Sequence, residues 1–493
     1  MEVSPPRGKS RPPLPSASIV DSLPPEILEK IVSHLPLRDA VRTSAISRAW
    51  RRLWESAPGL ALEWDWGADT DPAVAGAVLA RCSAPVRSFC FDLLVESFWR
   101  SDDWVPLLAA KGVQILKLNF SGGAGIDIHY MDASIFSCRG LTCLHLSGGC
   151  EIPAAPSGLA GFPKLTCLSL RKVGFPDNGV RGLEALIAES PLLEVLRLGE
   201  LWFTQDGGEY DHSFEQWTIQ APNLRILSIT SYYYYGWQIE ELPSIKEVEI
   251  TSSDYPTGYD FVKLITRFAR VKELSLKCRT GGREGNFLTV LPLQNFFEIL
   301  QRGWFKPRSL CHFTRIQSRG DRGRRKFPEC KLREVNVLEG LSCSFENLKK
   351  LTLQTKLNIL PTILSTLHFL KNAPYLETLH VDIMSGGNTQ EAEVSVDLLN
   401  AHWIGSSFAN LRTVIMDSIR CRPNEMHFIE FVLFNAPRLR ELRVLPIPSF
   451  PRSIKANGKF LREIAKYRKA SPQARLVVTC HPVFIMHPTL PFA

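Results

Sequence analysis

A short phrase of hydrophobic and polar residues recurs along most of the chain, with the form apolar-x-x-apolar-x-apolar. The last two apolar residues of each phrase are two apart, so they share one face of a short strand. Ten of the eleven intervals between successive phrases fall between 21 and 35 residues, which indicates a structural repeat. The twelve phrases are Val86–Phe91, Val113–Leu118, Leu141–Leu146, Leu165–Leu170, Leu193–Leu198, Leu224–Ile229, Ile245–Ile250, Val271–Leu276, Leu348–Leu353, Leu376–Val381, Leu411–Met416 and Leu439–Val444.

Several repeats also carry a helical spacing of apolar residues before the phrase. The clearest helical sets are Leu183-Leu186-Ile187, Phe261-Ile265-Phe268, Ile363-Leu364-Leu367-Leu370 and Phe428-Val432-Leu433. Three of these segments end at a proline-bearing connector: Ser190-Pro191, Ala373-Pro374 and Ala436-Pro437. Strand plus helix at this period resembles a leucine-rich repeat. The resemblance implies an α/β solenoid (horseshoe) of about 12 irregular repeats, with strands on the concave side and helices outside.

The beginning of the chain has a different spacing, which predicts a head of three short helices within residues 21–58. Pro24 and Pro25 open the first helix, because first-turn amides have no intrahelical partner to lose. Leu35-Pro36 ends it, since a residue before proline avoids the α region. The apolar residues expected on one face of this helix are Ile27, Leu28, Ile31 and Leu35.

The second helix of the head is expected over Arg38–Ile46, with Val41 and Ala45 facing inward. Ser47 is a suitable N-cap for the third, in which Trp50, Leu53 and Trp54 share a face. Three helices in about 40 residues bury too little apolar surface to be stable alone, and no disulfide or metal motif compensates. The head is therefore expected either to dock on a partner or to pack against the rest of its own chain.

The head resembles the F-box. The matching residues are Leu23-Pro24-x-Glu26-Ile27-Leu28, Ile31, Leu35-Pro36, Ala40-Val41 and Ser47-x-x-Trp50-x-x-Leu53-Trp54. The resemblance implies docking to a Skp-type adaptor, which joins an F-box protein to a cullin-based ubiquitin ligase. Carried over position by position, the implied adaptor-facing residues are Leu23, Pro24, Ile27, Leu28, Ile31, Leu35, Pro36 and Trp50.

The C-terminal region resembles the FBD region of plant F-box proteins. Its matching residues are Leu461, Tyr467, Ala470, Ser471 and Pro472. With this match, the chain is identified as a member of the plant F-box/leucine-rich-repeat proteins. The expected divisions are a disordered lead (1–18), the F-box (19–58), leucine-rich repeats (80–281), a basic insertion (282–333), further repeats (334–427) and the FBD-like region (428–493).

The insertion is inferred from one long interval of 77 residues, between Val271 and Leu348, which falls to about one repeat without residues 282–333. This stretch accounts for the whole net charge of +8: Arg302–Arg333 holds eleven Lys and Arg against two acidic residues, and the rest of the chain sums to about −1. Three interpretations stay open: a solvated, disordered loop, a non-coding segment retained in the gene model, and a nucleic-acid or nuclear-import patch. No aromatic residues alternate with the basic cluster Arg322–Lys326, which argues against nucleic acid as a partner.

The composition of the chain indicates in which cellular compartment the protein is expected. No apolar stretch approaches the ~18 residues that cross a bilayer, so no membrane partner is expected. The lead (1–18) is rich in Pro, Ser and Arg and lacks an apolar core, which argues against secretion. The twelve cysteines occur singly, which predicts reduced, mostly buried thiols and an intracellular protein of the nucleus, the cytoplasm or both.

Motifs of catalysis and metal binding are missing from the sequence, including H-E-x-x-H, G-x-S-x-G and the phosphate-binding loop. Cys311-His312 and Cys480-His481 are isolated pairs, so no metal and no cofactor are expected. The aromatic run Tyr232–Tyr235 with Trp237 is either a binding feature at a repeat rim or core that packs into a neighbouring repeat. The same two interpretations apply to Trp202 and Trp217.

The resemblance therefore implies a non-catalytic, substrate-recognition subunit of a Skp–cullin–F-box ubiquitin ligase. The F-box would dock the adaptor and the repeats would hold a protein target near a ubiquitin donor, a proximity effect. The alternative is an F-box/repeat interaction scaffold with no role in ubiquitin transfer. The target, the repeat residues that contact it and any need for a small-molecule ligand are not readable from the sequence.

Overall fold

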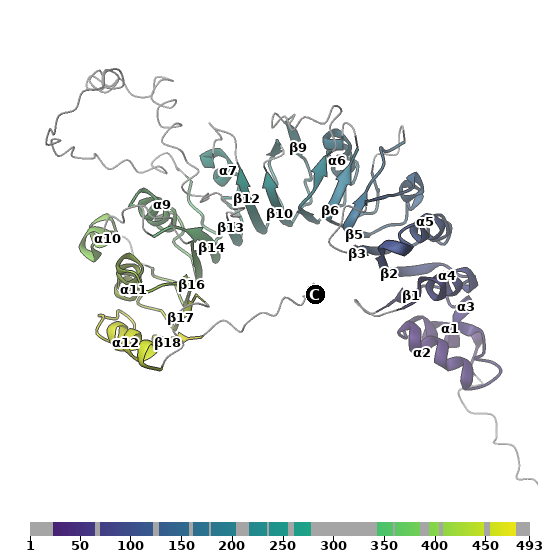
Figure 1. Cartoon of the computed structure of the whole chain (residues 1–493), viewed down its shortest axis with the longest axis horizontal. Coiled ribbons are helices and arrows are strands. Elements are labelled where there is room, and N and C mark those ends of the chain that lie inside the picture. The colour runs from purple at the N-terminus through teal and green to yellow at the C-terminus, as the bar shows by residue number, and fades with distance from the viewer. Residues whose placement is uncertain are drawn as a thin grey trace, which may run out of the picture. The chain divides into compact units, whose positions relative to one another are not determined.

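The computed structural model of the chain describes residues 23–64, 70–121, 128–156, 161–176, 179–203, 216–233, 236–254, 261–277, 343–357, 360–384, 394–403, 408–447 and 454–479. The chain forms two compact units, Met1–Leu165 and Thr166–Ala493. In each unit, helices lie on one side of a parallel sheet (Figure 1). The α/β solenoid expected from the repeats is thus confirmed. The predicted lead (1–18) and basic insertion (282–333) lie outside the described residues.

The first unit begins with the head. Its elements are α1 (Pro25–Ser33), α2 (Leu37–Arg42), the 3-10 turn η2 (Thr43–Ala45) and α3 (Leu53–Ser56). Parallel strands follow in the order β1 (Leu60–Glu63), β2 (Val86–Leu94), β3 (Ile115–Ser121) and β5 (Cys143–Glu151), and the short β4 (His129–Tyr130) pairs with β5. The connecting elements are α4 (Pro72–Arg81), η3 (Val95–Ser97), α5 (Arg100–Ala110) and η4 (Ala133–Ser137).

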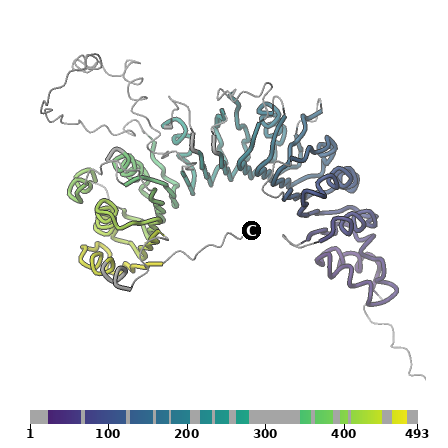
Figure 2. The backbone as a smooth tube through the Cα atoms, in the orientation of Figure 1, coloured from purple at the N-terminus to yellow at the C-terminus, as the bar shows by residue number. Residues whose placement is uncertain are grey.

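The second unit continues the same alternation of strand and connection along the backbone (Figure 2). Its strand order is β6 (Cys167–Phe175), β7 (Val195–Gly199), β10 (Ile226–Tyr233), β12 (Glu247–Asp254), β13 (Glu273–Lys277), β14 (Lys350–Thr355), β15 (Thr378–Ile383), β16 (Thr413–Ile419), β17 (Glu441–Pro446) and β18 (Arg475–Val478). The short β8 (Trp202–Phe203) pairs with β6, and β9 (Trp217–Ile219) pairs with β11 (Trp237–Ile239). The helices are α6 (Gly179–Ala188), α7 (Phe261–Arg267), α9 (Leu360–Lys371), α10 (Val396–His402), α11 (Pro423–Asn435) and α12 (Ile454–Ala465).

The twelve phrases form the core of the repeats. All thirty-six of their apolar residues are buried, and none is more than 5% exposed. Equivalent positions pair directly from strand to strand, as Leu196 does with Leu168 and with Leu227. Each strand therefore covers the apolar residues of the strand before it. A single repeat could not bury its own apolar residues in this way.

Strands β13 and β14 pair in this same register, although the long interval of the sequence separates Lys277 from Lys350. Leu274 lies opposite Leu351 and Leu276 lies opposite Leu353. The backbone N–H of Lys349 donates to the carbonyl of Lys272, 2.9 Å away. The prediction that the repeats continue across the long interval is confirmed.

The four helical spacings predicted within the repeats correspond to α6, α7, α9 and α11. Strands β1 and β18 were not predicted, because neither follows the full phrase. In the head, the third helix begins at Leu53 and not at Ser47. The Ser47 hydroxyl accepts from the backbone N–H of Ala49 at 3.2 Å and so caps a turn that precedes α3.

Several strands bend at one recurring place, four residues after the second apolar position of the phrase. The residues at this place have left-handed backbone angles: Gly148 (φ 87°), Lys172 (φ 52°), Glu200 (φ 51°) and Ser418 (φ 60°). At Gly148 a Cβ atom would lie 2.0 Å from the carbonyl oxygen of Phe120, so only glycine fits there. In β6 the bend leaves the consecutive residues Arg171 and Lys172 both exposed.

Candidate functional site: the head and the open strand face

Helix α1 has two apolar faces, not the single face predicted from Ile27, Leu28, Ile31 and Leu35. Leu28 and Val32 are four residues apart and buried, with Leu28 4% exposed and Val32 fully covered. Ile27 and Ile31 form the neighbouring pair and point away from the head, at 45% and 39% exposed. Successive positions of a helix differ by about 100°, so the four residues spread over roughly 140° around the axis, with the exposed pair at one side of this arc and the buried pair at the other.

The rest of the head adds to this outward apolar surface. Val41 is 37% exposed and Ile46 is 57% exposed. The prediction that Val41 and Ala45 face inward is wrong. The inward positions are Leu37, Ala40 and Thr43, three residues apart, because α2 is short and tightens into the 3-10 turn η2. Ile27, Ile31, Val41 and Ile46 are the exposed aliphatic residues of the head.

Two Leu-Pro pairs set the starts of α1 and α2. The carbonyl of Pro24 accepts from the backbone N–H groups of Ile27 and Leu28, at 3.0 and 3.2 Å. The carbonyl of Pro36 likewise accepts from Asp39 and Ala40, both at 2.9 Å. Both prolines are exposed, whereas the preceding Leu23 and Leu35 are half-buried. These four residues belong to the predicted docking set and lie at the two helix starts.

Trp50, the last residue of the predicted docking set, is 3% exposed and lies inside the head. Within the described residues its indole N–H has no hydrogen-bond partner. Leu28 and Trp50 therefore lie beneath the surface, while Pro24, Ile27, Ile31 and Pro36 are exposed. In this chain by itself, the eight residues are divided between the interior and the surface of the head.

The head is fastened to the first repeat through α3. The carbonyl of Glu55 accepts from the backbone N–H and hydroxyl of Ser83, at 2.7 and 2.9 Å. The Arg81 guanidinium pairs with the Glu55 carboxylate and lies over the Trp54 ring, 5.3 Å from its centroid. Between α3 and α1, Ser56 Oγ donates to Glu29 Oε1 at 3.2 Å. These contacts orient the exposed residues of α1 on a fixed support.

The second candidate surface is the face of the sheet in the second unit that lies opposite the helices, here called the open face. Between the two buried positions of each strand, one residue points to this face. The strand register brings these residues into one row across the unit. The central row is Ser169, Arg197, Ser228, Glu249, Ser275, Thr352, His380, Ile415, Arg443 and Val477.

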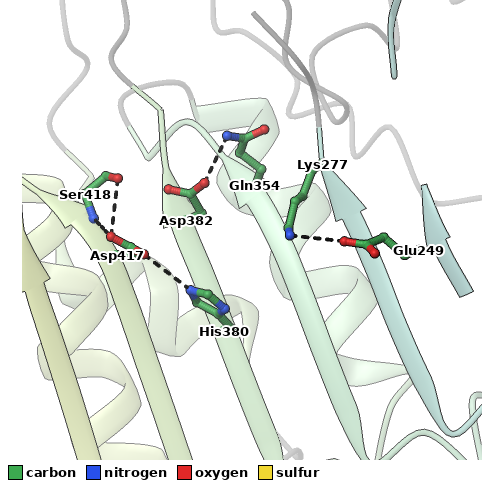
Figure 3. Close-up of polar contacts among 7 residues, drawn as sticks. All are labelled: Glu249, Lys277, Gln354, His380, Asp382, Asp417 and Ser418. Atoms are coloured by element: carbon green, nitrogen blue, oxygen red, sulfur yellow. Dashed lines mark hydrogen bonds and ion pairs between the residues drawn. The ribbon is translucent and has the colours of Figure 1, made fainter. Parts of the chain in front are cut away.

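Polar groups on β12 to β16 contact one another across this face (Figure 3). Lys277 Nζ lies 3.3 Å from Glu249 Oε1, and Gln354 Nε2 donates to Asp382 Oδ2 at 3.0 Å. His380 Nε2 lies 3.9 Å from Asp417 Oδ2, and the backbone N–H of Ser418 donates to Asp417 Oδ1 at 2.6 Å. The cations of these strands thus lie beside carboxylates of the same chain.

Two of the candidate aromatic residues are core. Trp217 and Trp237 lie opposite each other in the β9–β11 pair, and both are 2% exposed. The core interpretation is confirmed for these two residues. The indole of Trp202 lies over Gly174, where a Cβ atom would come within 2.2 Å of Trp202 Nε1. The side chains of Tyr232–Tyr235 lie outside the described residues.

The C-terminal region closes the second unit through residues of the predicted FBD match. Ser471 is buried, and its hydroxyl donates to the carbonyl of Leu439 at 2.7 Å. The backbone N–H of Ala470 donates to the carbonyl of Leu433 at 2.8 Å. Burial, with Glu430 and Glu463 nearby, raises the pKa of Tyr467 to about 12. These hydrogen bonds join the C-terminal region to α11 and to the residues just before β17.

Thiols and metal ligands give no sign of a reactive site in the described part of the chain. No disulfide joins the eight cysteines described there, and burial raises the pKa of Cys82 to about 11 and of Cys90 and Cys138 to about 12. In the same residues, no group of His, Cys, Asp or Glu is arranged to hold a metal ion. Cys311-His312 and Cys480-His481 lie outside them. No helix in the described ranges has both the length and the apolar character to cross a membrane.

Comparison with known proteins finds family matches for the head and for part of the repeats. Residues 20–60 match the F-box domain, and residues 101–256 match a family described as FBD-associated F-box protein At5g56370, LRR repeats. The F-box/FBD/LRR-repeat protein At1g13570 of Arabidopsis thaliana is 24% identical over 476 residues, which cover 94% of this chain and 98% of that protein. The FBD-associated F-box protein At4g10400 of the same plant is 26% identical over 313 residues, which cover 58% and 74%.

Proposed function

Because this chain is a plant F-box/leucine-rich-repeat protein, we propose that it is the substrate-recognition subunit of a Skp–cullin–F-box ubiquitin ligase. In this proposal the head docks a Skp-type adaptor, and through it a cullin. The repeats hold a protein target. The chain performs no chemistry itself and acts by positioning a target lysine near a ubiquitin donor, which replaces a slow encounter by proximity.

The observation that carries this proposal is the exposed aliphatic pair on α1. Ile27 and Ile31 are one turn apart on a helix whose adjacent face is already filled by Leu28 and Val32. Each is about 40% exposed although the head is small and rich in apolar residues. Covering such a pair with a partner removes apolar area from water at roughly 25 cal/mol per Å². We propose that Pro24 and Pro36, at the helix starts, extend the same contact.

The eight docking residues then have two roles in this proposal. Pro24, Ile27, Ile31 and Pro36 would contact the adaptor directly, with Leu23 and Leu35 at the edge. Leu28 and Trp50 would support them from beneath, since both are buried in the chain alone. A charge at Leu28 would therefore unfold the head before it tested any contact.

The docking test uses Ile27→Glu with Ile31→Glu in the full chain, co-expressed with a Skp-type adaptor. Charges buried without a partner cost several kcal/mol, so adaptor affinity should fall about 100-fold or more. The matched control is Val74→Glu with Leu107→Glu, which places the same charges on exposed apolar positions of α4 and α5. Calorimetry should give near wild-type affinity for the control. Equal loss in both pairs, or no loss in the first, would contradict the docking face.

The ligase role is tested separately from adaptor docking. Co-purification of a cullin with the wild-type chain, and loss of cullin with the Ile27/Ile31 pair of changes, are the expected results. Target abundance should rise when the chain is depleted. If the adaptor binds but no cullin follows and no target accumulates, the chain is a scaffold that works without ubiquitin transfer.

A further inference from the structure

Two arginines on the open face differ from the cations beside them. Arg171 lies on β6 directly after the repeat phrase, and Arg197 lies on β7 between the last two apolar positions of its phrase. Arg171 is exposed and Arg197 is half-buried. Among the described residues, neither guanidinium has an acidic side chain within ion-pair distance.

Other cations of the open face, on β12 to β17, do have acidic partners. Lys350 Nζ lies 2.8 Å from Glu273 Oε2, and Arg443 Nη2 lies 2.7 Å from Glu441 Oε1. Lys277 is paired with Glu249 (Figure 3). Even Lys172, next to Arg171, lies 3.9 Å from Glu200. The chain therefore supplies a carboxylate for each of these cations but not, within its described part, for Arg171 or Arg197.

The local backbone holds the two arginines in one place. Arg171 is opposite Gly199 and Arg197 is opposite Ser169, so the arginines are diagonal neighbours on adjacent strands. A Cβ atom at Gly199 would lie 3.3 Å from Arg171 Cγ, which shows that the stem of Arg171 lies close to Gly199 on the neighbouring strand. Strand spacing and rise place their Cα atoms about 8 Å apart.

This spacing matches one particular ligand geometry. In an extended peptide, side chains two residues apart share a face and are separated by about 7 Å. Two carboxylates at alternate positions could therefore each reach one guanidinium. Arginine suits this contact because its planar donors bind a carboxylate in pairs.

We propose that Arg171 and Arg197 receive a short acidic segment of the protein target, in extended form, with Asp or Glu at alternate positions. This inference rests on the proposed function, in which the repeats hold a protein target. A nucleic acid fits less well, because Glu249, Asp382 and Asp417 on the same face would repel a phosphate backbone. The acidic segment supplies the carboxylates that the described part of the chain does not place beside these two arginines.

The test measures binding of a labelled eight-residue peptide of alternating Glu and Thr to the full chain with its adaptor. Fluorescence anisotropy should show binding that weakens between about 50 and 300 mM salt, because exposed charges are screened. A Gln-Thr peptide of the same length should not bind. Arg171→Glu with Arg197→Glu should reduce affinity at least tenfold.

The matched control reverses two charges that already have partners. Lys350→Glu with Arg443→Glu makes the same change of charge on the same face, so the two double variants have the same net charge. Affinity for the Glu-Thr peptide should stay within about twofold of wild type. Arg171→Lys with Arg197→Lys should give an intermediate loss, because lysine keeps the charge but not the paired donors. Equal loss in the control, or no peptide binding by the wild-type chain, would overturn the proposal.

Two further measurements separate this inference from the proposed function. A Gln-Thr peptide with two phosphothreonines has a similar charge and should bind no better than the Glu-Thr peptide. Tighter binding of this phosphopeptide through the same arginines would assign the site to phosphate groups and overturn the proposal of an acidic segment. Adaptor binding should be unchanged in Arg171→Glu with Arg197→Glu. If the arginines bind the peptide but no target accumulates on depletion, the ligase role fails while the acidic-segment site stands.

Discussion

In the repeats all thirty-six apolar residues of the phrase are buried, whereas in the head four large aliphatic residues are 37–57% exposed. Both regions are rich in Leu, Ile and Val, so composition does not explain the difference. A repeat has a neighbour with the same apolar row, and strand pairing places that row in register. Within the described residues, the head has no such neighbour on the outer side of α1.

The difference teaches how an apolar pattern should be interpreted. Where the pattern recurs, the chain supplies its own cover and apolar residues indicate core. Where it occurs once, in a unit of about 40 residues, part of it stays outside and indicates a docking surface. The two regions can be separated experimentally, because substitutions in one should change stability and substitutions in the other should change binding.

The largest expected effect is in the repeats. Leu379→Ala removes a fully buried side chain that pairs with Leu351 on one strand and Val414 on the next. Loss of this burial and the resulting cavity should cost about 2–5 kcal/mol, seen as a lower thermal unfolding midpoint. Tyr375→Ala, at a 54% exposed position just before β15, is the control and should change the midpoint little. Equal effects would show that the stack is not what stabilises this unit.

A sharper comparison uses two adjacent residues of α1. Val32→Ala should cost about 2 kcal/mol, because Val32 is fully buried and loses two buried methyl groups. Ile31→Ala should cost well under about 1 kcal/mol in the chain alone, because Ile31 is already 39% exposed. Hydrogen exchange of the head measures both. The effects on adaptor affinity should have the opposite order, with Ile31→Ala weakening adaptor binding more than Val32→Ala.

A smaller effect is expected from removal of residues 282–333. The connection between β13 and β14 would then be similar in length to the one between β14 and β15, which runs from Thr355 to Thr378. A shorter connection costs less entropy to close, so the thermal midpoint should rise by the equivalent of about 1 kcal/mol. The control deletion, residues 282–353, also removes the Leu348–Leu353 phrase and should abolish cooperative unfolding. A lower midpoint for the first deletion would contradict an inserted segment.

The smallest expected effect is a dependence on pH in the first unit. Burial lowers the pKa of His129 below its ordinary 6.5, against the opposing effect of Asp102 beside it. The unfolded chain then binds the proton more readily than the folded chain. The stability that the folded chain gains from neutral His129 is therefore present above pH 6.5 and is lost as the pH falls below it. His129→Gln should therefore reduce the loss of thermal midpoint between about pH 7.5 and 5.5. A loss that stays as large in His129→Gln as in the wild type would contradict this prediction.

The sequence predicted the fold better than the surface. Leu274 and Leu351 fall in equivalent phrases, and period alone was enough to pair their strands across a long interval. The faces of the head were harder, because Ile27, Leu28, Ile31 and Val32 are all apolar and only packing decides which pair points inward. Arg171 and Arg197 were not singled out. Their signal is an Arg at outward positions of two successive repeats, but the lack of an acidic neighbour among the described residues is visible only in three dimensions.

The pairing of β13 with β14 has a consequence for how this molecule could be made. Backbone hydrogen bonds between neighbouring strands carry the stack past residue 277, and a continuous chain is not needed for them. Two separately produced polypeptides, one ending near residue 281 and one beginning near residue 334, should be able to reassemble at this seam. Such a split version would place target capture under the control of whatever brings the two pieces together.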